Sequence, residues 1–195
     1  MPAPGTHKKA LSGFVSTMRF LWLSFAVALA ACSGDGVTLT REQATVAHVE
    51  IHLRYLGSLG AVETAVLAEP FPQDADGEAI RRVMSAARVE PRLRYVATRP
   101  ANDLYGYRVV VAFGGWPIGG DSYCRNPALR PREASAEITE VQVVLCLGPS
   151  TLIETAGRTA RMSSPEDPRF ARLMTDLLTA FQTVASSSSD IESNP

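Results

Sequence analysis

The residues best suited to chemistry form one short cluster, His48, Glu50 and His52. On a β-strand the three side chains would point to the same side, because side chains alternate along a strand. On a helix, His48 and His52 would lie one turn apart. Two imidazoles and a carboxylate are ligands that zinc accepts, so the cluster is a candidate site for a metal-dependent hydrolase. The favoured interpretation is the polar half of a half-buried strand, because Arg54 continues the same face.

Other residue types that support catalysis occur without the partners they need. Ser58 lies in Leu-Gly-Ser-Leu-Gly, which departs from the G-x-S-x-G elbow of serine hydrolases. Glu137 and Glu140 would lie on opposite faces of a strand, so they do not form the carboxylate pair of a glycoside hydrolase. The glycine-rich segment 114–120 lacks the lysine of a phosphate-binding loop. The sequence therefore predicts a protein that is not an enzyme and carries no cofactor.

The N-terminal segment has the pattern of an export signal. Arg19 precedes an apolar run over residues 20–31, which is far shorter than the roughly 20 residues of a membrane-spanning helix. The run ends in Leu-Ala-Ala and is followed by Cys32, a sequence that resembles the lipobox of bacterial lipoproteins at all four positions. In that family the cysteine is acylated and the chain is cut before it, and several acyl chains make a stable anchor. A plain secretory signal is the alternative.

The resemblance implies an address for the protein. Residues 1–31 would be the signal peptide, with Met18 as an alternative start, and Cys32 would carry the lipid. In enteric-type sorting, an aspartate after the lipidated cysteine retains a lipoprotein at the inner membrane. Ser33 stands at that position, so the expected location is the periplasmic face of the outer membrane. The periplasmic side of the inner membrane is the alternative.

Once Cys32 is assigned to lipid, two of the three cysteines remain. An even pair in an oxidising compartment predicts a disulfide between Cys124 and Cys146. Closing a loop of this length stabilises a protein by about 3 kcal/mol on the chain-entropy model. Two unrelated buried thiols are the alternative, whereas a zinc site would need a CxxC motif or a histidine nearby.

Composition excludes some classes of protein. A hydrophobic fraction of 46% and a charged fraction of 20% are typical of a globular domain. Loss of residues 1–31 removes three cations and no acid, so the net charge of −1 becomes −4. This mild acidity argues against nucleic-acid binding, which uses a concentrated basic face.

The hydrophobic pattern predicts the elements of a single α+β domain. Alternation over residues 46–56 predicts a strand, although a helix from Thr40 with Val46, Val49 and Leu53 in register stays open. Further strands are expected at 61–67, 92–98, 107–113, 137–147 and 151–160. Helices are expected to start at caps Asp76 and Asp167, the second with Pro168 in its first position.

This order of elements implies a mainly antiparallel sheet of about five or six strands, with two helices packed on one face and one disulfide. The expected organisation is the lipidated cysteine and a polar tether over 32–44, the domain over 45–185, and a disordered tail over 186–195.

The long loop 114–135 is the expected partner surface, since loops of this length without secondary structure are often functional. Trp116 is its candidate contact residue, because tryptophan is enriched at interface hot spots. Small α+β domains behind a lipobox resemble, in architecture only, auxiliary lipoproteins of envelope transport and lipopolysaccharide assembly. The sequence therefore predicts an accessory protein that binds an envelope protein. The alternatives are a periplasmic binder of a small apolar or lipid ligand and the hydrolase built on His48, Glu50 and His52.

Overall fold

The structure is a computed structural model that describes residues 36–190, apart from 47, 69, 72, 75–76, 116–118, 127 and 132–135, and gives the backbone alone for 187–190. The described elements belong to the unit that begins at Val37. The predictions for Cys32, Asp76 and Trp116 fall outside the described residues.

Six strands and four helices form within these residues. The strands are β1 (Thr38–Ala44), β2 (Ala61–Leu67), β3 (Arg94–Val96), β4 (Tyr107–Phe113), β5 (Ile138–Leu147) and β6 (Ser150–Ala160). The helices are α2 (Val49–Leu59), α3 (Glu78–Ala86), α4 (Gly120–Arg125) and α5 (Pro168–Asp190). The predicted α+β class is confirmed.

The strands make one mixed sheet in the order β1-β6-β5-β4-β2-β3. The strands β1, β6, β5 and β4 pair antiparallel, whereas β4, β2 and β3 pair parallel. The expectation of a mainly antiparallel sheet was therefore wrong for the half that holds β2 and β3. The reason is the connection through α3, because a helix between two strands allows the chain to cross over and pair them in parallel.

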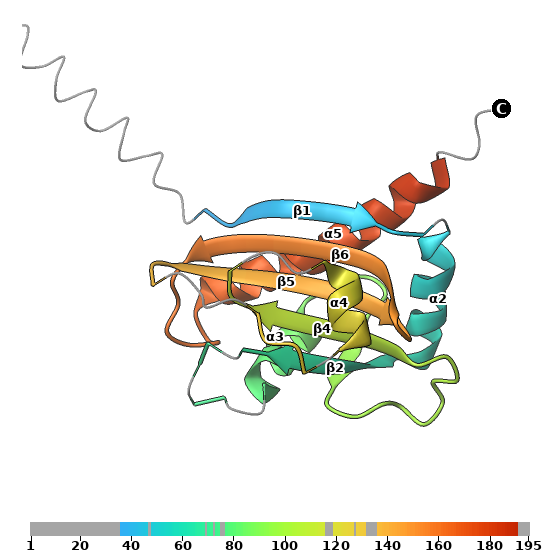
Figure 1. The fold of residues 1–195 in the computed structure, drawn as a ribbon, viewed down its shortest axis with the longest axis horizontal. Coiled ribbons are helices and arrows are strands. Elements are labelled where there is room, and N and C mark those ends of the chain that lie inside the picture. Colours follow the sequence, from blue (N-terminus) through green and yellow to red (C-terminus); the bar gives the residue numbers. More distant parts are fainter. Residues whose placement is uncertain are drawn as a thin grey trace, which may run out of the picture. The chain divides into compact units, whose positions relative to one another are not determined.

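Helices cover both faces of the sheet (Figure 1). The large core lies between the sheet and α2, α3 and α5, and a smaller core of Val110, Ala112, Tyr123, Cys124, Val144 and Cys146 lies under α4. The expectation of two helices on one face was wrong. Because β4 and β5 bury apolar residues on both faces, the second face also needs a cover, and α4 provides part of it.

Residues 46–56, predicted as a strand, contribute instead to α2. Val49, Leu53 and Leu56 are buried at helical spacing, whereas Ile51, which the alternating pattern placed beside them, is 58% exposed. The alternative prediction of a helix in this segment was correct. Its predicted start at Thr40 was wrong, because residues 38–44 form the edge strand β1. This strand occupies most of the segment that was expected to be a tether.

The last helix is longer than predicted at its C-terminal end. Asp167 and Pro168 begin α5 as expected, with the Asp167 carboxylate accepting the Arg169 backbone N–H at 2.9 Å. The helix continues to Asp190, five residues beyond the predicted end of the domain at 185. No helix in the described part of the chain is both long and apolar enough to cross a membrane.

Candidate functional site

The structure keeps His48 close to Glu50 but places the His52 side chain against a different partner. His48 precedes α2 in a left-handed conformation with φ 59°, and its Nδ1 lies 3.6 Å from a carboxylate oxygen of Glu50. The Nδ1 of His52 lies 2.7 Å from the hydroxyl of Tyr107 on β4 instead. Among the described residues, no three His, Cys, Asp or Glu side chains are grouped to hold a metal ion.

His52 belongs to an aromatic cluster at one end of the sheet. The Tyr55 ring from α2 lies 5.1 Å from the ring of Tyr105 and 5.5 Å from that of Tyr107, measured between centroids. Burial raises the pKa of Tyr107, and Tyr55 and Asp103 raise it further, so its hydroxyl stays neutral near pH 7. Edge-to-face and tilted ring pairs of this kind contribute about 0.5–1.5 kcal/mol each beyond the area they bury. The cluster therefore ties α2 to the start of β4.

The loop before β4 is held by the buried carboxylate of Asp103. One oxygen accepts the backbone N–H groups of Tyr105 and Gly106 at 3.0 Å, and the other accepts that of Tyr107 at 2.8 Å. The Arg99 Nε lies 3.3 Å from the second oxygen, and its Nη2 donates to the Asp103 carbonyl at 2.7 Å. Gly106 supplies the positive φ, 77°, that the turn requires. This set of bonds gives the loop one conformation.

Three large apolar side chains are exposed on and beside this loop. Leu104 is 79% exposed, Tyr105 62% and Ile51 58%. Tyr55 links them, because its hydroxyl accepts the Leu104 backbone N–H at 3.5 Å and its position on α2 is one turn from Ile51. These three exposed residues are called the Leu104 patch below.

The Leu104 patch and the start of β1 lie at opposite ends of the sheet. Tyr107 pairs with Leu147, and Ala44 at the end of β1 pairs with Ile153 near the start of β6. Thr38 at the start of β1 pairs with Arg158 near the far end of β6. In Figure 1, α2 and the loop before β4 accordingly lie at the right-hand end, where β1 finishes.

The segment 114–135, expected to lack secondary structure, contains α4. The predicted disulfide is confirmed, with the Cα atoms of Cys124 and Cys146 5.5 Å apart. The buried Glu154 carboxylate accepts the Gly120 backbone N–H at 2.9 Å, and Asp121 accepts the Thr151 N–H at the same distance. A helix of six residues is therefore fixed to β5 and β6 by three links.

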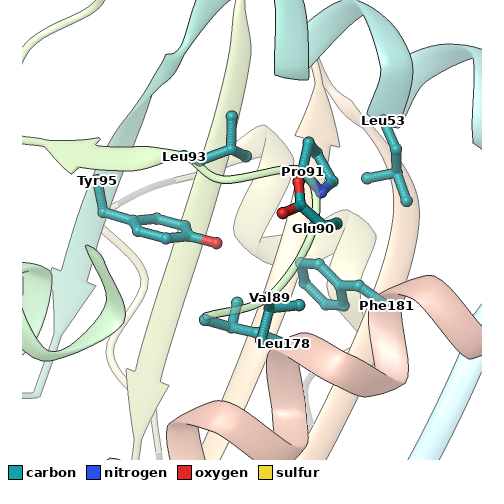
Figure 2. Close-up of a pocket in the computed structure, with 8 residues that line it drawn as sticks. All are labelled: Leu53, Val89, Glu90, Pro91, Leu93, Tyr95, Leu178 and Phe181. Atoms are coloured by element: carbon teal, nitrogen blue, oxygen red, sulfur yellow. The ribbon is translucent and has the colours of Figure 1, made fainter. Parts of the chain in front are cut away.

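A small pocket lies between α2, α5 and the chain that leads into β3 (Figure 2). Leu53 and Phe181 line it, and the Tyr95 hydroxyl points into it. Burial raises the pKa of Tyr95, so this hydroxyl is neutral. The volume is about 20 Å³, which suits one water molecule and not a lipid chain.

Sequence reasoning missed the Leu104 patch. The signal was present, since the turn-forming residues 100–103 are followed directly by Leu104 and Tyr105. Two large apolar residues at the tip of a polar turn have no neighbouring strand that could bury both of them.

Comparison with known proteins adds little to this description. No family model matches the chain, and no curated protein matches it. Among solved structures, the chain is similar to a PelC variant from Paraburkholderia phytofirmans that was solved as a dodecamer. The identity is 12%, the TM-score is 0.41, and the match covers 75% of this chain and 98% of that one. A similarity at this level carries no argument about function.

Proposed function

We propose that the protein is a lipid-anchored accessory of the bacterial envelope that binds another protein through the Leu104 patch and is not an enzyme. The observation that carries the binding role is the exposure of Leu104 and Tyr105 on a loop that Asp103 holds in one conformation. The lipid anchor rests on the lipobox that ends at Cys32.

Rigid display of apolar side chains favours binding. Exposed apolar groups gain free energy when a partner covers them, at about 25 cal/mol per Å² removed from water. Ordering a flexible loop would offset this gain, but four contacts to the Asp103 carboxylate already order this one. Tyrosine is also among the residues that contribute most at protein interfaces.

The position of the patch favours a protein partner over the membrane that holds the anchor. Cys32 precedes Thr38 by six residues, which span at most about 20 Å. The chain enters β1 at the far end of the sheet from the patch, and seven strand residues cover about 23 Å. An anchor at Cys32 would therefore join the domain at the end of the sheet opposite to the patch.

A photo-crosslinking residue at position 104 of the full chain, in its native membranes, tests this function. We expect irradiation to give a discrete adduct with one other protein, because Leu104 would lie inside the interface. The same residue at Arg172, an exposed position on α5, is the matched control and should give no such adduct. Adducts with lipid alone, or equal protein adducts from both positions, would contradict the proposal.

A further inference from the structure

Two exposed guanidinium groups flank the Leu104 patch. Arg54 lies on α2 three residues after Ile51, so it is a neighbour of Ile51 on the helix surface. No hydrogen bond or ion pair to Arg54 occurs among the described residues. The Arg99 side chain is 47% exposed, and its guanidinium lies about 3.5 Å from where a Cβ on Gly106 would be.

The acids next to these two groups in the sequence are half-buried or buried. Asp103 is 1% exposed and is bonded to Arg99 and to three backbone N–H groups. Glu50 lies one turn before Arg54, but its carboxylate is within 3.6 Å of His48 and its side chain is 32% exposed. The solvent-facing charge beside the apolar patch is therefore positive, in a protein whose mature chain is acidic overall.

We infer that the Leu104 patch takes an acidic, apolar segment of its protein partner, in which a large apolar side chain lies next to carboxylates. This inference rests on the proposed function and adds the chemistry of the partner. The apolar side chain would cover Leu104 and Tyr105, and a carboxylate would meet Arg54 with the planar, two-bond geometry that guanidinium favours. A basic partner would instead bring like charges together beside the patch.

A second copy of the same chain fits this surface less well. A two-fold interface places the same patch on both sides, so Arg54 and Arg99 of one copy would approach those of the other. An anionic bilayer has the right charge. Binding to such a bilayer is therefore one of the outcomes that the test below separates.

Selection from a random-peptide display library on the purified full-length protein tests the inference. We expect enriched peptides to carry aspartate or glutamate next to leucine or an aromatic residue. Leu104→Asp should abolish their binding, since position 104 is 79% exposed and the substitution leaves the core intact. An unchanged melting temperature of this variant confirms that the fold is retained.

The charge contribution is measured with the best enriched peptide. Arg54→Gln should weaken its binding about two- to fivefold, the range for one exposed ion pair. Arg54→Glu should weaken it further, and high salt should reduce both differences. Arg172→Glu reverses the charge of another exposed arginine, on α5, and should leave binding unchanged.

Three outcomes would overturn the inference. These are enrichment of neutral or basic peptides, binding that is the same with Arg54 and Glu at position 54, and no enrichment over Leu104→Asp. Binding of the Cys32→Ser chain to phosphatidylglycerol vesicles that Leu104→Asp abolishes would assign the patch to a membrane instead. A protein adduct from position 104 without any preference for acidic peptides would leave the proposed function standing and remove only this inference.

Discussion

Arg99 and Asp103 form an ion pair in which the acid is almost completely buried and the base is half exposed. The Nε–Oδ2 distance is 3.3 Å, and the two side chains are 47% and 1% exposed. The backbone N–H groups of residues 105–107 also donate hydrogen bonds to this carboxylate. The loop that displays Leu104 is thus organised around one charge.

Asp103→Asn should lower the free energy of unfolding by about 2–3 kcal/mol, because hydrogen bonds to a charged acceptor become bonds to a neutral one and an amide N–H₂ replaces one acceptor. Arg99→Gln should cost about 1 kcal/mol or less, since the arginine is half exposed. Urea unfolding of both variants gives the comparison. Equal losses would mean that the ion pair with Arg99, and not the backbone hydrogen bonds, accounts for the contribution of the carboxylate.

Gly77→Ala should destabilise the protein more than Gly60→Ala, although both glycines have similar positive φ values, 65° and 68°. A Cβ on Gly77 would lie 2.7 Å from the Cβ of Val66, whereas one on Gly60 would meet nothing within 4 Å. The shared conformational penalty is about 1 kcal/mol, and the clash should add about 1–3 kcal/mol. Thermal unfolding of the pair isolates the steric part, and equal melting temperatures would refute it.

Replacing both Cys124 and Cys146 with alanine should cost about 3 kcal/mol of unfolding free energy, because the bridge closes a loop with a sequence separation of 22. Hydrogen exchange should also become faster in α4, which the disulfide fixes to β5. Wild-type protein unfolded without reductant is the reference. An unchanged unfolding free energy would show that the polar links of α4 suffice.

Acid should destabilise the α4 region through Asp121. Its backbone hydrogen bond from Thr151 holds the pKa of this carboxyl below its usual range. A lowered folded pKa gives stability that is present above the unfolded pKa, about 4, and is lost as the pH falls through the folded value. Asp121→Asn should therefore make the unfolding free energy less dependent on pH below about 4. Parallel pH profiles for the two proteins would exclude this role.

Cys32→Ser should release the protein from membranes and abolish incorporation of labelled palmitate, because the serine hydroxyl does not replace the acylated thiol of a lipobox. Labelling of cells followed by membrane fractionation measures both effects. The Cys124 and Cys146 double alanine variant is the matched control and should stay labelled. Equal labelling of wild type and Cys32→Ser would contradict the anchor.

Strands that begin after a turn residue were predicted well from the sequence, and the elements that depend on distant contacts were not. The predicted and observed bounds of β2 and β4 agree, because Gly60 and Gly106 mark where these strands begin. The apolar residues around Val49 fit both the two-residue period of a strand and the 3.6-residue period of a helix. The helix forms because it buries Leu56 against the rest of the core together with Val49. Parallel pairing of β2 with β4 has no local signature either.

The site was harder to predict than the fold for a related reason. The residue types of the histidine cluster suggested a metal site. His52 instead lies within hydrogen-bond distance of Tyr107, which is 55 positions away in the chain. The sequence alone does not show that Leu104 and Tyr105 are exposed, because their exposure depends on the hydrogen bonds by which Asp103 holds the loop. The disulfide, in contrast, followed from counting cysteines and was confirmed.

The placement of β1 determines how the domain would respond to tension. A pull between the segment before Thr38 and the Leu104 patch has a component along the axis of β1, because the two points lie at opposite ends of the sheet. The hydrogen bonds to β6 run across that axis, so they share the load in shear and do not open one after another. The Arg41–Glu154 ion pair between the two strands carries part of the same load. A domain held between an anchor and a partner is thereby built to resist stretching in the direction in which it would be pulled.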